Sequence, residues 1–364
     1  MTFPELDYIT WAKSAPPARI NLARSGVEPA PASLLKLTAA DLVTTLPVRY
    51  GYGPLRDAIA HRYRVKPDAV FAISGGTSFA NWLACAAALD GAGRHAEVIV
   101  ERPTYEPLLR IPEILGGRVR RFDRRFTDGF SVDLGRFRAK ITRRTRLAIV
   151  TNLHNPSGVR IPLDTLRAMA AALARVRGYL LVDEIFLEGT FSVRTDSCVH
   201  AGPNVLTTNS LTKAYGLDGL RAGWILGPPA LTARAGQIND LLTNNSVAPG
   251  EQMTLAAFTQ LGAIDRRAHA LLDPNLATLR RFLARERRVD AVPPDGGSIA
   301  FLRLPRHIDA DRLAKHLLRR YSTLVVPGRF FESPRYVRVS FGCKPAVLAR
   351  GLANISRALD DLRA

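Results

Sequence analysis

The sequence has 364 residues, of which 47% are hydrophobic and 23% charged, and its 51 Lys and Arg outnumber its 32 Asp and Glu. This composition excludes a disordered tail and a fibre, and the length suffices for two structural units with sizeable cores. The net charge of +19 would suit a nucleic-acid partner. We nevertheless expect none, because the arginine runs lie in or beside predicted strands and helices and have few aromatic side chains between them.

The cysteines and the apolar stretches indicate the compartment. Cys85, Cys198 and Cys343 are widely spaced and form no CxxC pair, which argues against a disulfide framework or a zinc site and for a reducing compartment. Residues 1–10 carry acids instead of the basic run of a secretory signal. The mostly apolar stretch 79–89 is far shorter than the ~20 residues that a membrane span needs. We expect a cytoplasmic protein with no membrane partner and no metal.

Predicted strands and helices alternate through the first two thirds of the chain. The predicted strands are 69–73, 97–100, 147–151, 179–182, 205–208 and 224–226. Helices are expected over 77–89, up to residue 115, and over 163–176. This alternation is typical of βαβ units around a mainly parallel sheet.

The pattern changes near residue 251. Long helices are predicted over 255–261 and 265–288, the second interrupted at Pro274, and strands and helices follow over 298–304, 310–320, 324–326 and 336–341, before a final helix. We therefore predict an α/β protein. Its large domain would span residues 47–262, and a smaller α/β domain would be built from both chain ends, residues 1–46 and 263–364.

Polar residues follow four of the predicted strands, over 74–77, 152–158, 183–184 and 209–213. Any one of these segments is explained by ordinary turn chemistry. In open parallel sheets, however, ligands bind at the carboxyl ends of the strands. Four such segments in one sheet indicate a ligand site.

Lys213 follows the strand 205–208 in the segment Ser210-Leu211-Thr212-Lys213, and Arg221 lies eight residues further on. A lone lysine of this kind is more often a surface residue. A neighbouring cation would lower its pKa, which suits an amine that forms a Schiff base. The hydroxyls of Ser210 and Thr212, together with the Arg221 guanidinium, could hold a phosphate.

Other residues at the strand ends allow two interpretations each. Gly76 and Thr77 form either a phosphate-binding helix N-terminus or a plain turn with a threonine cap. Asp183 either caps the next turn or faces a ligand cation. Asn155 either sits in a simple turn or donates to a ligand oxygen. Tyr105 either packs in the core or stacks on a flat cofactor.

In their order along the chain, these residues resemble those of fold type I pyridoxal 5′-phosphate enzymes, specifically the class I and II aminotransferases. The resemblance runs from about residue 50 to residue 341 and implies a seven-stranded sheet. It implies that Lys213 forms the Schiff base with the cofactor and later shuttles a proton. Asp183 would pair with the pyridine nitrogen, and Asn155, in an Asn-Pro-Ser-Gly segment, would bond the phenolic oxygen and lie beside the substrate.

The resemblance also assigns the other groups. Arg338 would clamp the substrate α-carboxylate, and Tyr105 would stack on the cofactor ring. In a homodimer, Tyr50 or Tyr52 would reach the phosphate of the neighbouring subunit, with Tyr50 preferred. The phosphate of the chain's own site would be held by Gly76, Thr77, Ser210, Thr212 and Arg221.

Two residues depart from the family pattern. Phe186 stands where the family usually has a tyrosine that bonds the phenolic oxygen. The absence of that tyrosine hydroxyl would slow transamination or favour another outcome. His154 is unusual before Asn155 and is either a satisfied loop residue or a substrate contact.

The resemblance implies an aminotransferase that moves an amino group from an amino acid to a 2-oxo acid in ping-pong fashion. The alternative is another enzyme of this fold acting on an amino acid: a lyase, decarboxylase, cyclase or oxidase. A non-catalytic, cofactor-binding regulatory module is disfavoured, since residues 1–49 show no helix-turn-helix pattern.

Overall fold

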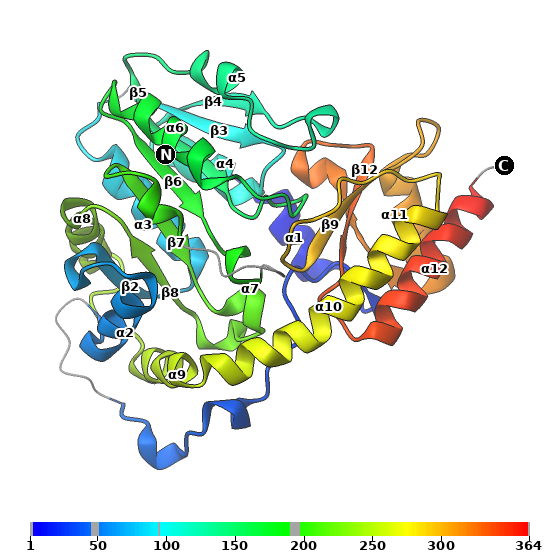
Figure 1. Cartoon of the computed structure of the whole chain (residues 1–364), viewed down its shortest axis with the longest axis horizontal. Coiled ribbons are helices and arrows are strands. Elements are labelled where there is room, and N and C mark those ends of the chain that lie inside the picture. The colour runs from blue at the N-terminus through cyan, green and yellow to red at the C-terminus, as the bar shows by residue number, and fades with distance from the viewer. Residues whose placement is uncertain (1–2, 45–50, 94, 190–196, 363–364) are drawn as a thin grey trace.

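The computed structural model describes residues 3–44, 51–93, 95–189 and 197–362, and its larger part is built on a seven-stranded sheet (Figure 1). The strand order is β2-β8-β7-β6-β5-β3-β4, and β8 alone runs opposite to the others. The strands are β2 (Val70–Ser74), β3 (Glu97–Arg102), β4 (Arg118–Asp123), β5 (Thr145–Thr151), β6 (Tyr179–Asp183), β7 (Val205–Asn209) and β8 (Ala222–Leu226). The mainly parallel, seven-stranded sheet expected from the sequence is therefore confirmed.

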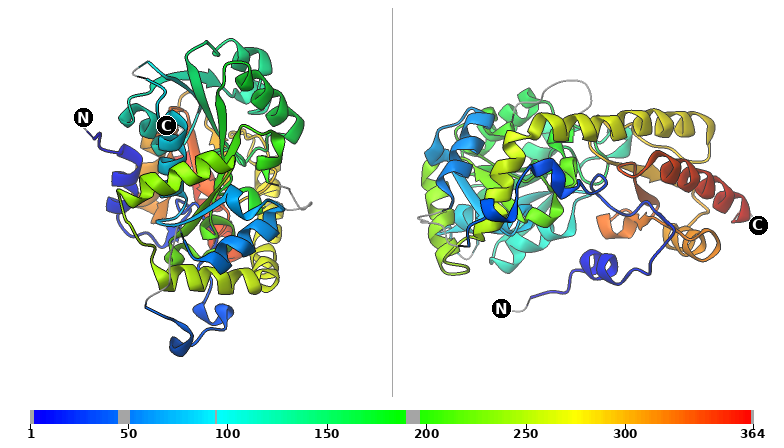
Figure 2. Two further views of the ribbon diagram at one scale, coloured as in Figure 1. Left: turned by 90° about the vertical axis from the view of Figure 1, so that its left-hand side faces the viewer. Right: turned by 90° about the horizontal axis from the view of Figure 1, so that it is seen from below.

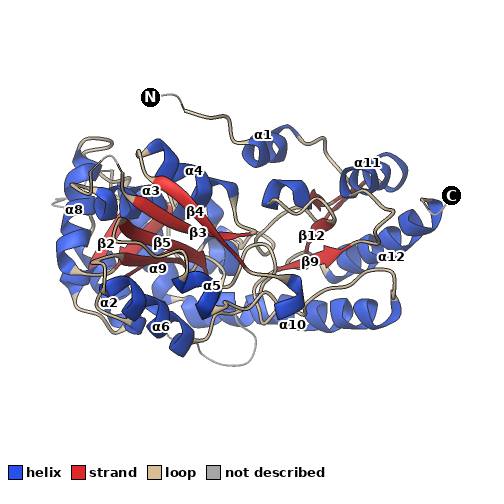
Figure 3. Ribbon diagram, turned by 90° about the horizontal axis from the view of Figure 1, so that it is seen from above, coloured by secondary structure: helices blue, strands red, loops and turns tan. Residues whose placement is uncertain are grey.

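Helices cover both faces of this sheet (Figure 3), which explains why its central strands are apolar on both sides. Val98 and Val100 of β3 pack in one cluster with α3 and α4, whereas Ile99 packs in another cluster with α6, as the twofold alternation of a strand requires. The helices of this part are α2 (Gly53–Tyr63), α3 (Thr77–Leu89), α4 (Glu106–Ile114), α5 (Leu134–Arg138), α6 (Leu163–Ala174), α7 (Thr212–Tyr215), α8 (Pro229–Asp240) and α9 (Ala248–Thr259).

The smaller part combines both ends of the chain. Ile20 and Leu22 share a hydrophobic cluster with residues between 272 and 362. A three-stranded antiparallel sheet has the order β11-β12-β9, and β1 pairs in parallel with β10. The elements are α1 (Asp7–Ser14), β1 (Ile20–Asn21), β9 (Ile299–Arg303), α11 (Ala310–Tyr321), β10 (Thr323–Leu324), β11 (Val326–Pro327), β12 (Tyr336–Ser340) and α12 (Pro345–Asp361).

A long helix, α10 (Leu261–Arg285), joins the two parts (Figure 2). The predicted interruption at Pro274 is wrong, because the helix continues through it. Proline removes one backbone hydrogen bond, but Leu272 and Leu276 on either side are buried in the same cluster, and this packing maintains the helix. The expected domain boundary between residues 262 and 263 falls inside α10, and that between 46 and 47 lies outside the described residues. The division into domains stays a prediction.

Two further features bear on the expectations. Strand β4 was not predicted; it is an arginine-rich edge strand whose side chains are largely half-buried or exposed. Within the described ranges, no helix is long and apolar enough to cross a membrane. The carboxyl ends of β5, β6 and β7 and the N-terminal end of α3 all bring residues to one cavity.

Candidate functional site

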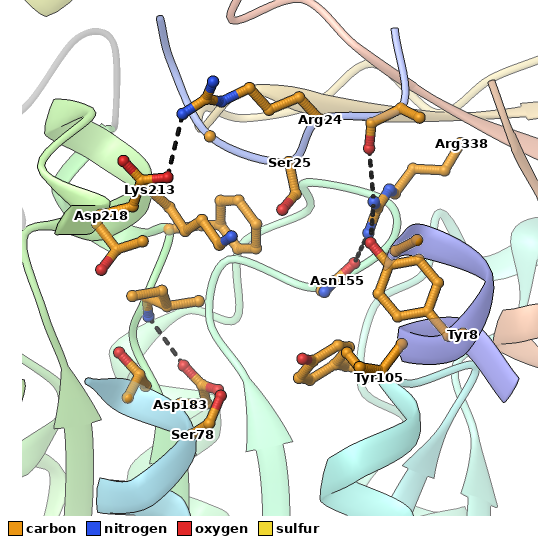
Figure 4. A pocket seen from close by; sticks show the side chains of 18 of the residues that line it. Tyr8, Arg24, Ser25, Ser78, Tyr105, Asn155, Asp183, Lys213, Asp218 and Arg338 are labelled. Atoms are coloured by element: carbon orange, nitrogen blue, oxygen red, sulfur yellow. Dashed lines mark hydrogen bonds and ion pairs between the residues drawn. The ribbon is translucent and has the colours of Figure 1, made fainter. Parts of the chain in front are cut away.

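A cavity of about 510 Å³ is lined by residues from the large sheet, from α1 and the segment after β1, and from β12 (Figure 4). Eight of the residues predicted to act on cofactor or substrate line it: Thr77, Tyr105, Asn155, Asp183, Thr212, Lys213, Arg221 and Arg338. These residues span more than 260 positions of the sequence, so the fold brings them together.

Lys213 lies in α7, directly after β7, and its side chain points into the cavity (Figure 4). The segment after β1 packs closely on it: the amide of Val27 donates to the Lys213 carbonyl at 3.0 Å. A Cβ on Gly26 would lie 3.3 Å from the Lys213 Cα. Burial, followed by the charge of Arg338, lowers the pKa of Lys213 to about 8. A minor but appreciable fraction of the amine is therefore neutral near physiological pH, as a nucleophile or base requires.

Asp183 ends β6 and is buried in the cavity wall. Its two oxygens accept hydrogen bonds from the Asn81 amide at 2.8 Å and from the Ile185 backbone at 3.0 Å. Burial raises the pKa of Asp183 to about 6, although the bond from Asn81 opposes this. Thr208 donates to the Asn81 carbonyl oxygen at 2.5 Å, so the amide of Asn81 is oriented toward the carboxylate. The arrangement holds an anion where a ligand cation could bind.

Three hydroxyls form a chain at the N-terminus of α3. Thr77 donates to Ser210 at 2.9 Å, and Ser210 donates to Thr212 at 2.9 Å. The guanidinium of Arg221 closes this cradle by donating to the Gly75 carbonyl at 2.7 Å. Gly76 has a φ of +74°, and a Cβ there would lie 3.1 Å from Arg221 Nη2, so only glycine fits without displacement. Hydroxyls, a cation and a helix N-terminus together suit a phosphate.

Arg338 enters the cavity from β12 and is almost completely buried. Its guanidinium donates to Asn155 Oδ1 at 3.2 Å, to the Tyr8 hydroxyl at 2.8 Å and to the Ala23 carbonyl at 3.2 Å. These three acceptors are uncharged, so among the described residues no carboxylate hydrogen-bonds to it. A buried guanidinium without an anionic partner is suited to a carboxylate of a ligand.

The two residues that depart from the family pattern lie in different places. Phe186 is buried, lines the cavity and packs with Leu153 and Ile299, so it presents only hydrocarbon. His154 lies outside the lining; Ser157 Oγ is 2.6 Å from Nδ1 and the Pro103 carbonyl is 3.0 Å from Nε2. Its position matches the interpretation as a satisfied loop residue.

Three of the predicted residues that the structure describes, Gly76, Ser210 and Tyr52, do not reach the lining. Gly76 and Ser210 lie directly behind it and act on it through Arg221, Thr77 and Thr212. Tyr52 precedes α2, away from the cavity, and its backbone amide donates to Glu251 at 2.8 Å. Tyr50 lies outside the described residues. A contact of either tyrosine with a second subunit stays a prediction.

Several lining residues were not predicted from the sequence, chiefly Tyr8, Arg24, Ser25, Asn81 and Asp218. Asn81 is four residues after Thr77 in α3, and this helical spacing could have identified it. Arg24 pairs with Asp218 at 3.1 Å at the cavity, both about half exposed. Nothing local in the sequence relates Tyr8 to Arg338, which is 330 positions away.

The chain is similar to known proteins along most of its length. The model of the family described as aminotransferase class I and II matches residues 28–355. Capreomycidine synthase of Streptomyces vinaceus is 34% identical over 84% of this chain and 78% of the relative. The arginine–pyruvate transaminase of Pseudomonas aeruginosa is 30% identical over 65% of this chain and 61% of the relative. A crystal structure of the PLP-dependent cyclase OrfR, 28% identical, matches 100% of this chain and 98% of that chain with a TM-score of 0.87.

Proposed function

From the premise that the chain belongs to the class I and II aminotransferase family of pyridoxal 5′-phosphate enzymes, we propose that it removes the Cα proton of a free α-amino acid with Lys213. The observation that carries this proposal is the convergence of Lys213, Asp183 and Arg338 on one cavity. A base, a buried anion and a carboxylate-binding cation are the three groups that this chemistry needs around its cofactor.

The residues of the cavity fit the cofactor. The cradle of Thr77, Thr212 and Arg221 would hold its phosphate. Glycine at residue 76 keeps this cradle intact, because a side chain there would press on the Arg221 guanidinium. Asp183 would face its pyridine nitrogen, and Tyr105 would pack against its ring. When bound, pyridoxal 5′-phosphate supplies an electron sink that stabilises negative charge at Cα.

The protein's own groups would divide the remaining work. Arg338 would orient the substrate by a bidentate bond to its α-carboxylate, in exchange for the bond to Tyr8, while its bond to Asn155 is kept. Nζ of Lys213 would accept the Cα proton, because its lowered pKa leaves it partly neutral at pH 7 to 8. Tyr8 and Trp11 of α1 line the cavity and would limit the entry of water.

For the fate of the substrate, we propose ring closure within one amino acid that carries a leaving group X at Cβ. The Cβ–X bond would break, a side-chain nitrogen would form a bond to Cβ, and the proton lost from that nitrogen would leave with X as HX. Two relatives that match most of this chain support this: capreomycidine synthase and the cyclase OrfR. Phe186 also supports it, because a hydrocarbon lines the cavity where aminotransferases usually have a tyrosine hydroxyl.

Transamination is the second candidate. It is favoured by the similarity to the arginine–pyruvate transaminase, and it would proceed by ping-pong exchange of the amino group with a 2-oxo acid. Both candidates share the step at Lys213 and differ in whether the nitrogen leaves the substrate.

We further propose a substrate with a basic side chain. Once the cofactor and the α-carboxylate have their partners, Asp218 is the remaining carboxylate of the described lining, and its partner Arg24 is exposed enough to turn into solvent. The named substrate of the Pseudomonas relative, arginine, has such a side chain.

The test is exchange of the Cα proton in heavy water, followed by mass spectrometry of the products. The holoenzyme is incubated with L-arginine, L-lysine and L-aspartate in parallel with Lys213→Ala. We expect exchange with a basic amino acid that is lost in the variant. The panel also includes basic amino acids with a hydroxyl at Cβ as the leaving group. A cyclic product that retains the α-nitrogen and is lighter than its substrate by one water would support cyclisation, whereas a 2-oxo acid and an aminated cofactor would establish transamination. Absence of Lys213-dependent exchange and turnover with every amino acid tried would overturn the proposal.

A further inference from the structure

A buried ion pair lies behind the cavity, between the ends of β3 and β4. Arg124 Nη1 donates to Glu101 Oε2 at 2.9 Å, and neither side chain is exposed to solvent. Arg124 Nε also donates to the Phe130 carbonyl at 2.6 Å. Neither residue lines the cavity. A buried pair of charges is weak evidence for stability, because the cost of desolvation offsets much of the attraction. We therefore consider which neighbouring residues this pair holds in position.

The other oxygen of Glu101 leads toward the cavity. Glu101 Oε1 accepts from the Thr151 backbone amide at 2.6 Å and from the Thr151 hydroxyl at 2.7 Å. Since the Thr151 hydroxyl donates its hydrogen to Glu101, its oxygen lone pairs remain available to accept a hydrogen bond. They accept from the backbone amide of Asn155 at 2.9 Å.

Asn155 stands at the end of this chain of hydrogen bonds, in contact with the cavity. Its Oδ1 accepts from Arg338 at 3.2 Å, which leaves its amide nitrogen as the donor available to a ligand. The chain thus runs without a gap from Arg124 through Glu101 and Thr151 to Asn155 and Arg338. It connects the edge of the large sheet with the small one.

We propose that the pair Glu101 and Arg124, acting through the Thr151 hydroxyl, is a positioning device that fixes Asn155 so that it bonds Arg338 and the cofactor's ring oxygen together. Glu101 and Arg124 are positioning residues in this proposal, because they touch neither cofactor nor substrate. The inference rests on the proposed function and on the bond to the cofactor's ring oxygen that the family resemblance implies for Asn155.

The geometry explains why a carboxylate is needed at residue 101. One oxygen serves Thr151 and the other serves Arg124, so both act as acceptors. A glutamine would place its amide nitrogen against one of these donors and would leave either Arg124 or Thr151 unsatisfied.

The same strands supply a matched control. Glu97 and Arg120 lie four residues earlier on β3 and β4, and they form a similar pair at 3.0 Å. Glu97 also accepts from a threonine hydroxyl, that of Thr142, at 2.7 Å. This second pair lies at the opposite end of the strands and lines no part of the cavity.

The test measures the pH midpoint of the visible absorbance band of the bound cofactor. An amide that donates to the ring oxygen lowers this midpoint, so Asn155→Ala should raise it. We expect Thr151→Val to raise it in the same direction by about half a pH unit or more, the worth of one hydrogen bond. Thr151→Ser, which keeps the hydroxyl, should restore the wild-type midpoint, Glu101→Gln should raise it, and Glu97→Gln should leave it unchanged.

The outcomes separate the two proposals. If Asn155→Ala shifts the midpoint and Thr151→Val does not, the positioning inference is wrong while the role of Asn155 stands. If Asn155→Ala produces no shift, the role of Asn155 is wrong and the inference falls with it. Thr151→Val retains the Glu101–Arg124 pair, so it gives a result even where Glu101→Gln fails to fold. A midpoint shift of similar size in Glu97→Gln would show that the shift in Glu101→Gln comes from a general disturbance of the sheet, and the positioning inference would be wrong.

Discussion

At the scale of single residues, the lowered pKa of Lys213 makes the capture of cofactor dependent on pH. The neutral amine is the nucleophile, and its fraction rises as pH increases through about 8, instead of through the ordinary value of 10.5. We expect the rate at which the cofactor-free protein captures pyridoxal 5′-phosphate, followed by absorbance, to rise with a midpoint near pH 8. Arg338→Met should move the midpoint upward by removing a positive neighbour. A wild-type midpoint near 10.5 would contradict the assignment.

Asp183 should make cofactor affinity fall in acid. Its pKa of about 6 in the folded protein means that the carboxylate is lost as pH falls through 6, and a protonated acid cannot pair with a pyridinium. Asp183→Asn should weaken binding at pH 7.5 by about 10- to 100-fold, the worth of a charge-assisted hydrogen bond. It should also flatten the pH dependence between 5 and 7, as measured by fluorescence titration. An unchanged pH profile in the variant would assign the titration to another group.

The same pKa predicts how stability depends on pH in the cofactor-free protein. The folded-state pKa lies above the ordinary value of 3.8, so the folded protein prefers the protonated acid. This contribution to stability is present below about pH 3.8 and is lost as pH rises through 6. A bound pyridinium reverses the preference. Cofactor should therefore raise the melting temperature of the wild type more than that of Asp183→Asn.

At the scale of elements, α1 depends on a residue outside itself. Its N-cap residue, Leu6, provides no side-chain cap, and the carboxylate of Glu106 accepts from the amides of Asp7 at 3.2 Å and Tyr8 at 2.8 Å instead. A helix of 8 residues is marginal without such bonds. Because Tyr8 in this helix bonds Arg338, the anchoring of α1 affects the carboxylate site.

Lys13 and Arg19 are exposed but lie in or near α1, so we expect Glu106→Ala to speed tryptic cleavage after them by loosening the helix. We also expect KM to rise about 3- to 10-fold, with a smaller effect on kcat, as follows from about 1 kcal/mol of capping energy. The matched control is Glu113→Ala on the same helix, α4, whose partner Arg110 is about as exposed as Glu113 itself. Equal effects in the two variants would contradict an anchoring role for Glu106.

The sequence predicts those elements whose environment it encodes locally. The runs in β5 and β6 are apolar on both faces because helices cover both, and this pattern was readable. Strand β4 was not, since an edge strand tolerates arginines that resemble a solvated segment. The predicted interruption at Pro274 was wrong because the packing of the neighbouring leucines keeps α10 continuous.

The residues of the candidate site likewise differ in whether the local sequence points to them. Lys213, Asp183 and Asn155 follow strand ends, so position along the chain pointed to them. Tyr8, Arg24 and Glu101 act through contacts with residues that are distant in the sequence. Such contacts leave no mark in a local pattern, and only the fold reveals them.

At the scale of the whole molecule, the net charge of +19 predicts salt-sensitive attraction to polyanions. We expect a gel-shift experiment with duplex DNA to show weak, sequence-independent binding at about 50 mM salt that disappears by about 200 mM, because counterion release drives it. Cofactor should not alter this binding. Retention above 200 mM salt, or preference for one sequence, would contradict the expectation that nucleic acid is no partner.

The pairing of β1 with β10 has a consequence for how the site is assembled on the ribosome. Ile20 pairs with Thr323, and the Tyr8 hydroxyl accepts a hydrogen bond from Arg338. The N-terminal segment, which is synthesised first, can therefore take its place only after nearly the whole chain has been made. The phosphate cradle and Lys213 can be assembled once residue 226 has been synthesised, because β8 joins β2 to β7. During translation, a nascent chain could therefore meet its cofactor well before it could grip a substrate, and the carboxylate clamp would be the final part of the catalyst to form.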